Sequence, residues 1–169
     1  LTNLTALELE VNGISDLTPL IENTGILGEI KLKNNLLGNT ALSTHIPALE
    51  ARGIEVEYDM PEGVVMFKDV NLEKAIREAL GIPTELLKKE DLAGLKELTK
   101  LNSENKGIVD LTGIEHCVNL ISLELGNNRI SELSPLKGVT NLAALNLWGN
   151  SFSNVKPLSN LTNLTYLSL

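Results

Sequence analysis

The sequence contains little of what catalytic, metal-binding or disulfide-linked domains require. Its single cysteine, Cys117, excludes an intrachain disulfide framework and a cysteine-based metal site, and His45 and His116 are its two histidines. Aromatic residues make up 3% of the 169 residues, so the core cannot draw its volume from them. These shortages predict a protein without metal or cofactor, whose core is built from aliphatic side chains.

Basic charge and long apolar runs are also scarce. The net charge of −8 leaves no basic stripe to neutralise nucleic acid phosphates or to meet an anionic membrane surface. No apolar run reaches the 18 residues of a membrane span. We therefore expect neither nucleic acid binding nor membrane insertion. Residues 1–60 carry nine acidic and three basic side chains, which either attract a basic partner or form an ordinary solvated surface.

Catalytic arrangements are missing as well. Glu90 and Asp91 stand in a segment with a helical pattern, where acidic side chains favour a helix N-terminus. His116 and Cys117 are adjacent, so their side chains point in different directions. The phosphate-binding, zinc-protease and Ca²⁺-loop motifs do not occur in the sequence. We expect no enzymatic activity.

Leucine and asparagine are abundant instead, with 34 and 18 residues. The frame L-x-x-L-x-L-x-x-N-x-I-x-x-L-x-P-L repeats every 22 residues in the second half of the chain, spans residues 4–20, and returns 23 residues later at 27–37. The repeats of the second half begin at Leu98, Leu120, Leu142 and Leu164. Matches at so many positions indicate an internal repeat.

Each position of the frame has a structural role. The L-x-L alternation predicts a short strand with one buried face. The Asn behind it can bond backbone groups that would otherwise be buried unpaired, and Pro-Leu suits the start of a return segment on the outer face. Because one repeat cannot bury its own leucines, neighbouring repeats must stack. The frame therefore predicts an α/β solenoid of leucine-rich repeats with short parallel strands on its concave face.

Several segments outside the frame have helical or strand patterns. Residues 39–52 predict a helix, and the strand that follows at 54–58 carries acidic residues that discourage further pairing at a sheet edge. A second helix is predicted from 71 to 80 and a short one at 86–95. These segments would cap the repeat arrays.

The second helix and the repeats resemble those of the bacterial internalin-like leucine-rich repeat proteins. F-K-D-V-N-L at 67–72, D-L-A-G-L at 91–95 and I-V-D-L-T-G-I at 108–114 are similar to that family's helical N-terminal cap and first repeat. I-S-D-L-T-P-L at 14–20 is similar to its later repeats, whereas Lys106 departs from the pattern at a ladder Asn position. The resemblance implies a right-handed superhelix with a helical N-terminal cap. It also implies a concave face that grips a partner protein, outside the bacterial cell or on its surface.

The order of these segments is unusual, because the end of one repeat array precedes the start of another. H-I-P-A-L at 45–49 is similar to the family's ending. We interpret residues 1–59 as the C-terminal end of a solenoid, with two repeats and a cap. Residues 60–66 are then a linker, and residues 67–169 an N-terminal cap with the start of a second solenoid. On this interpretation the sequence spans the junction of two tandem solenoids.

The alternative is that the uncapped strand edges pair head to tail between molecules and form a homo-oligomer. The leucines of these edges are Leu4, Leu7, Leu167 and Leu169. Pairing within one chain is disfavoured, because the linker spans at most about 25 Å and six strand spacings measure about 29 Å.

Strand residues between the leucines face outward and predict a surface for a protein partner. Trp148 is the principal candidate, because an exposed Trp is a common interface anchor, unless it shields a neighbouring strand or lies against Arg129. Tyr166, on the terminal strand, serves either contact or assembly. The other candidates are Asn146, Glu124, Asn102, Glu104, Lys31, Lys33, Glu8 and Glu10. We expect a protein-binding module; the alternatives are a self-assembling structural module and a recognition arm for an enzyme or anchor outside this chain.

Overall fold

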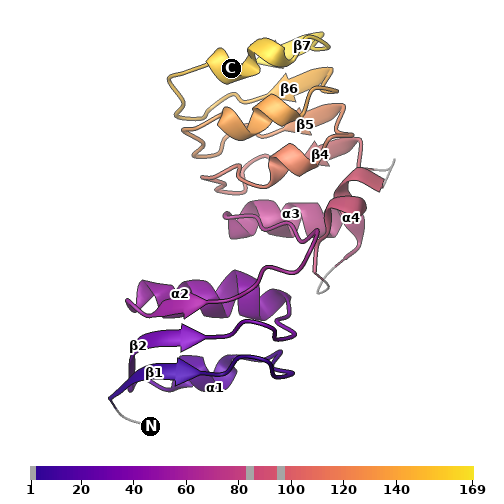
Figure 1. The fold of residues 1–169 in the computed structure, drawn as a ribbon. Helices are drawn as coiled ribbons and strands as arrows, with labels where there is room; N and C mark the ends of the chain where they lie inside the picture. The colour runs from indigo at the N-terminus through magenta and orange to yellow at the C-terminus, as the bar shows by residue number, and fades with distance from the viewer. Residues whose placement is uncertain (1–2, 83–85, 95–97) are drawn as a thin grey trace. The chain divides into compact units, whose positions relative to one another are not determined.

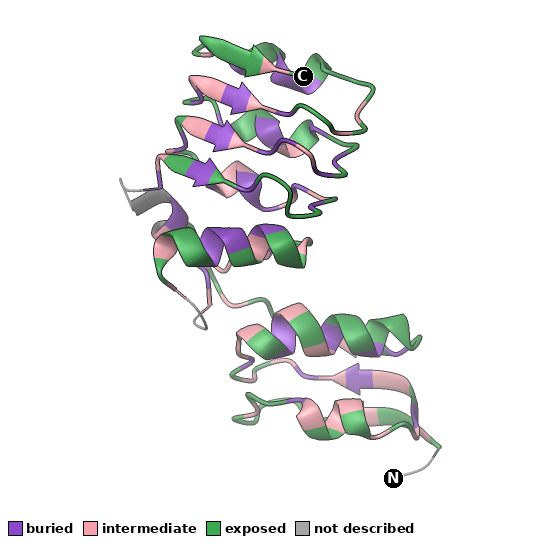
Figure 2. Cartoon of the chain, turned by 180° about the vertical axis from the view of Figure 1, so that it is seen from behind, coloured by how far each residue is buried: buried purple, intermediate pink, exposed green. Residues whose placement is uncertain are grey.

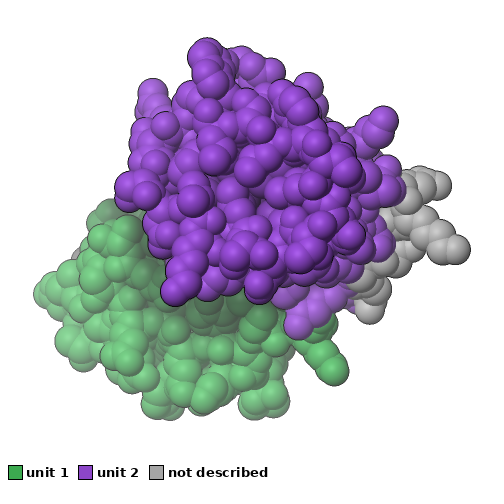
Figure 3. Space-filling view, turned by 90° about the horizontal axis from the view of Figure 1, so that it is seen from above, with its two compact units in different colours: residues 1–64, 84–86 green, residues 65–83, 87–169 purple. Residues whose placement is uncertain are grey.

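A computed structural model describes residues 3–82, 86–94 and 98–169, which form two compact units (Figure 1 and Figure 3). Unit 1 comprises Leu1–Val64 with Thr84–Leu86, and unit 2 comprises Val65–Pro83 with Leu87–Leu169. Each unit has its own sheet, with strand orders β1-β2-β3 and β4-β5-β6-β7. Consecutive strands pair in parallel, as the repeat frame predicts.

Unit 1 combines three parallel strands with short helices. Its elements are β1 (Leu4–Glu8), α1 (Thr18–Glu22), β2 (Ile26–Lys31), the π-helical turn η1 (Ala41–His45), α2 (Ile46–Ala51) and β3 (Glu55–Glu57). The helix predicted at 39–52 is confirmed, although its first turn is π-helical, and its Leu42, Ile46 and Leu49 are buried. The predicted strand at 54–58 is confirmed as the three-residue edge strand β3.

A β-bulge absorbs the extra residue of the 23-residue repeat. The pairing of β1 with β2 is offset by 22 residues at its start and by 23 after the bulge. A Cβ on Gly28 would stand 1.8 Å from the carbonyl oxygen of Thr5, so only glycine fits this close approach without a backbone shift. Beyond the bulge Glu8 lies level with Lys31, which brings the charged positions of the two strands together.

Unit 2 combines two helices with four repeats. Its elements are α3 (Val70–Leu80), α4 (Lys89–Gly94), the strands β4 (Lys100–Asn102), β5 (Ser122–Glu124), β6 (Ala144–Asn146) and β7 (Tyr166–Ser168), and the 3-10 turns η2 (Ile114–His116), η3 (Ser134–Gly138) and η4 (Lys156–Asn160). The helix predicted at 71–80 is confirmed, and the predicted short helix is α4; its last residue, Leu95, falls outside the described residues.

The core of unit 2 lies between the sheet and the 3-10 turns (Figure 2). Leu123 and Leu145 of the strands and Leu136 of η3 are fully buried in one cluster. Leu72 and Ile76 of α3 belong to the same cluster, so this helix covers one end of the repeats. Each such side chain contributes about 1.5–3 kcal/mol by leaving water. Aliphatic burial therefore supplies the stability that aromatic residues provide elsewhere.

Asp69 connects α3 to the first repeat of unit 2. As the helix N-cap, its Oδ1 accepts hydrogen bonds from the N–H groups of Asn71 (2.9 Å) and Leu72 (3.1 Å). Its Oδ2 accepts the N–H groups of Val109 (2.6 Å) and Asp110 (3.3 Å), 40 residues along the chain. One carboxylate thus satisfies backbone donors of two elements.

The asparagines behind the strands form the predicted ladder. Nδ2 of Asn128 donates to the carbonyl oxygens of Leu125 in its own repeat and Ser103 in the preceding repeat, both at 2.8 Å. Its Oδ1 accepts amide N–H groups of that preceding repeat. Asn35 and Asn150 bridge their repeats in the same way. Buried backbone groups at the turns are therefore paired across repeats.

The structure explains why Lys106, and not Asn, occupies the ladder position of the first repeat in unit 2. This position lies beside α3, in a shallow hollow lined by Asn71 and Lys74, and not behind another repeat. A helix bonds most of its own carbonyl groups, so an Asn at 106 would face no row of strand carbonyls. The ladder therefore begins at the second repeat.

A second row of asparagines, not predicted above, lies before the strands. Nδ2 of Asn141 donates to the carbonyl oxygen of Val118 (2.8 Å), and Nδ2 of Asn163 donates to that of Thr140 (3.0 Å). The signal was present in the sequence, because these asparagines are also 22 residues apart. The repeat that contains β6 is thus bonded to its predecessor on both sides of the strand, by Asn141 and Asn150.

The residue just before each ladder position adopts a left-handed backbone conformation. Asn34, Asn105, Asn127 and Gly149 have φ between 55° and 72° there. These residue types tolerate that region. Val11 occupies the same position with φ 54°, which is strained for a β-branched residue.

Candidate functional site

The outward face of the four-stranded sheet carries three columns of side chains. The first is Lys100, Ser122, Ala144 and Tyr166, the second Asn102, Glu124, Asn146 and Ser168, and the third, just beyond the strands, Glu104, Gly126 and Trp148. We call this set the unit 2 strand face. It brings together all the candidate residues that were predicted in the second half of the chain.

Trp148 exposes 57% of its surface. Its backbone is held on both sides: its N–H donates to Oδ1 of Asn146 (3.1 Å), and its carbonyl accepts the N–H of Asn127 (2.7 Å). The indole forms no hydrogen bond or ring contact with the described residues, and Arg129 is not paired with it. A fixed backbone therefore presents an aromatic side chain to solvent.

Glu104 stands in the same column as this tryptophan, and Glu124 stands one strand and one column away. A Cβ on Gly126 would stand 3.5 Å from both Cγ of Glu104 and the carbonyl oxygen of Trp148, so the Glu104 side chain lies over the glycine. Nδ2 of Asn127 donates to Oε1 of Glu104 (3.2 Å) and holds it there. The half-buried side chain of Glu124 forms no hydrogen bond or ion pair within the described parts of the chain.

Two predicted binding residues, Asn102 and Asn146, accept hydrogen bonds within their own repeats. Oδ1 of Asn102 accepts the N–H of Glu104 (3.1 Å), and Oδ1 of Asn146 accepts that of Trp148 (3.1 Å). These asparagines position the third column, and Nδ2 of Asn146 stands 3.3 Å from where a Cβ on Gly126 would lie. These hydrogen bonds could have been predicted from the sequence, because an Asn side chain after a strand commonly bonds the backbone N–H two residues further along the chain.

The predicted edge residues differ in exposure. Leu4 and Leu7 on β1 are half-buried, whereas Leu167 and Leu169 expose 45% and 51% of their surface. Tyr166 on β7 exposes 56%, and among the described strands β7 pairs with β6 alone.

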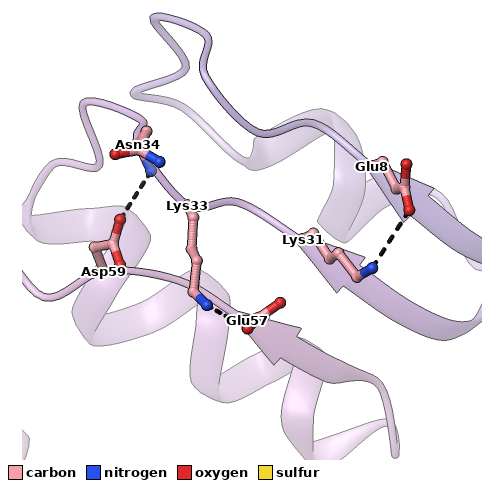
Figure 4. A network of polar contacts seen from close by, with 6 residues as sticks. All are labelled: Glu8, Lys31, Lys33, Asn34, Glu57 and Asp59. Carbon is pink, nitrogen blue, oxygen red and sulfur yellow. Dashed lines mark hydrogen bonds and ion pairs between the residues drawn. The ribbon is translucent and has the colours of Figure 1, made fainter.

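The strand face of unit 1 is a network of ion pairs (Figure 4). Nζ of Lys31 donates to Oε1 of Glu8 at 3.3 Å, and Nζ of Lys33 donates to Oε1 of Glu57. These hydrogen bonds to carboxylates raise the pKa of each lysine above its ordinary value. Glu10 is exposed beside them. The predicted candidates Lys31 and Lys33 are thus already paired, and Glu57, which completes the network, was not among the predicted binding residues.

Groups with reactive chemistry are buried or serve as caps. Cys117 is 1% exposed, and burial raises the pKa of its thiol to about 12, so little reactive thiolate forms at neutral pH. Asp91 accepts the N–H of Lys88 (2.7 Å) at the start of α4, as its sequence position predicts. Over the described ranges, no three His, Cys, Asp or Glu side chains are grouped as metal ligands. No helix within those ranges has the length and apolar character needed to cross a membrane.

No family model and no curated protein matches the chain, but solved structures do. Internalin F from Listeria monocytogenes is 33% identical with a TM-score of 0.56, over 60% of this chain and 29% of that one. The functional domain of InlJ from the same species is 35% identical with a TM-score of 0.54, over 60% of this chain and 22% of that one. Internalin C2 is 30% identical over 99% of this chain and 72% of that one, with a TM-score of 0.45, at which the superposition supports no argument.

The chain thus spans 29% and 22% of the length of the first two proteins. Their identity and their TM-scores above 0.5 agree with the F-K-D-V-N-L segment at 67–72, with the 22-residue frame and with the parallel strand stacking. The chain is an internalin-like leucine-rich repeat protein.

Proposed function

We propose that the chain is a non-enzymatic protein-binding module whose partner lies on the unit 2 strand face, with Trp148 at the centre of the contact. The observation that carries this proposal is the 57% exposed indole on a fixed backbone. Tryptophan is enriched among the residues that dominate interface energies. A rigid strand face also loses little conformational entropy when it binds.

The proposal uses the wider architecture that the repeats favour. Stacked repeats of this kind form solenoids, and we infer that the unit 2 strand face is the concave side of a right-handed one, with α3 as its N-terminal cap. Residues 1–59 are then the end of one solenoid, 60–66 a linker and 67–169 the start of another. We infer from the family resemblance that such a module acts outside a bacterial cell or on its surface.

Selection of phage-displayed random peptides on the immobilised full chain tests the proposal. Clones are re-tested on Trp148→Ala and on the control Leu36→Ala, which removes a 73% exposed apolar side chain from unit 1. We expect clones whose affinity falls about thirtyfold on Trp148→Ala, the loss of about 2 kcal/mol that is typical of a central anchor. Leu36→Ala should leave these clones bound. A selection without any Trp148-dependent clone would contradict the proposal.

A second candidate function is head-to-tail assembly through Leu4, Leu7, Leu167 and Leu169. The exposed leucines of β7 favour it, because an unpaired strand edge is a template for another strand. Assembly predicts a mass in light scattering that rises with concentration and returns to the monomer in Leu167→Asp. A wild-type chain that stays monomeric at all concentrations excludes this function.

A further inference from the structure

We infer that the protein partner places a lysine or arginine side chain on Trp148, between the carboxylates of Glu104 and Glu124; this inference rests on the proposed function. Cations stack on exposed indole rings within about 6 Å of the ring centre. Here the exposed ring shares its column with Glu104, Glu124 lies one strand and one column away, and the ring is not paired with any described cation. The site therefore offers both an aromatic surface and negative charge.

The third column places an acidic side chain in line with the indole. Glu104 and Trp148 stand in one column, two strand spacings or about 10 Å apart. Gly126, between them, has no side chain of its own and is buried beneath the amide of Asn146 and the side chain of Glu104. Asn127 holds Glu104 over the glycine through its 3.2 Å hydrogen bond. A guanidinium or ammonium group of the partner would therefore reach the exposed indole from solvent, above the Asn146 amide and the Glu104 side chain.

The negative charge of the unit 2 strand face favours a basic side chain of the partner over an apolar one at Trp148. Glu124 is half-buried and stands one strand and one column from Trp148, so a partner that covers the indole also covers this carboxylate. Burial of an unpaired carboxylate costs several kcal/mol. A basic side chain on the partner removes that cost. Lys100, the basic residue of this face, stands on the first strand and in the first column, away from Trp148.

The strand face of unit 1 provides the contrast. There Glu8 and Glu57 are already neutralised by Lys31 and Lys33. In unit 2 neither Glu104 nor Glu124 forms an ion pair among the described residues. The partner of unit 2 is therefore expected to supply the cation that unit 1 supplies from its own strands.

The experiment begins with the Trp148-dependent clones of the selection. Their peptides are synthesised without tryptophan and titrated against the full chain, with fluorescence of Trp148, its only tryptophan, as the signal. The test variant is Glu104→Gln with Glu124→Gln. The matched control is Glu22→Gln with Glu50→Gln, which changes the net charge equally at two exposed helix residues of unit 1, outside its strand face. Substitution of each basic residue of the peptide by citrulline or norleucine identifies the side chain that binds.

We expect the Trp148-dependent peptides to be enriched in Lys and Arg. Their affinity should fall about tenfold on the test variant and stay within about twofold on the control. Trp148-dependent peptides without basic enrichment, or with equal losses on both variants, overturn the cation site and leave the protein-binding proposal standing. The absence of Trp148-dependent peptides overturns both. Trp148-dependent binding of neutral oligosaccharides in place of peptides also overturns both.

Discussion

Replacement of Asp69 by alanine is predicted to destabilise unit 2 more than any single surface change of similar size. The carboxylate accepts four backbone N–H groups, two in the first turn of α3 and two at the corner of the first repeat. Alanine removes all four acceptor contacts at once. The helix would lose its N-cap, and Val109 would lose a 2.6 Å partner.

The expected magnitude follows from these contacts. Loss of an aspartate N-cap costs about 1 kcal/mol, and hydrogen bonds to a charged acceptor contribute about 1.5–3 kcal/mol each. The 3.3 Å contact with Asp110 is long and counts for little, and water replaces part of the bond at the exposed Val109. We therefore expect a loss of about 2–4 kcal/mol, or roughly 2 M in the urea midpoint of a unit this size.

Urea unfolding followed by Trp148 fluorescence measures this change, because the chain's only tryptophan lies in unit 2. Hydrogen exchange at Val109 shows whether the repeat corner opens. Asp69→Asn keeps a capping oxygen and should lose about half as much. Asp59→Ala removes a comparable acceptor in unit 1, the 2.9 Å partner of the Asn34 N–H, and should leave the Trp148 transition unchanged. An Asp69→Ala midpoint equal to that of Asp59→Ala would refute the reasoning.

Three further changes test other features of the fold. Val11→Asn should raise the stability of unit 1 by about 1 kcal/mol, because Asn tolerates the left-handed backbone that strains valine; a lower melting temperature would count against this. Gly28→Ala should destabilise unit 1 by about 3 kcal/mol, because its Cβ would meet the Thr5 carbonyl at 1.8 Å; an unchanged thermal transition by circular dichroism would show that the bulge relaxes. Hydrogen bonds from Thr112 hold the pKa of Asp110 below its ordinary value of 3.8. The contribution of the Asp110 carboxylate to the free energy of unfolding is therefore complete above pH 3.8 and is lost as the pH falls below that value. When the free energy of unfolding is measured as a function of pH, it should fall less steeply in acid for Asp110→Asn than for the wild type. Equal slopes for the two proteins would argue against this role.

The repeat frame predicts much of the fold, because its consequences follow from residue types at a fixed spacing. Leu123 and Leu145 are buried where the L-x-L alternation puts them, and Asn128 bonds across repeats as its position requires. The third-column position of Trp148 also follows from the frame. Periodicity works here because each inner repeat has a repeat of the same kind on both sides.

Features that join unlike segments escape this kind of prediction. The bond from Asp69 to Val109 links a helix cap to a repeat, and no period relates the two residues. The 23-residue spacing reveals an extra residue but does not say that Gly28 carries it. The contact of Glu104 with Asn127 likewise depends on rotamers that the frame leaves free.

The ladder bonds all run in one direction along the chain. Asn128 completes the repeat that contains Ser103, and Asn150 completes the repeat that contains Leu125. During synthesis on the ribosome a repeat is therefore finished only after the next one has left the exit tunnel. Folding of unit 2 would trail emergence by one repeat of 22 residues. Because α3 is made before these repeats, it supplies the surface on which the first of them stacks.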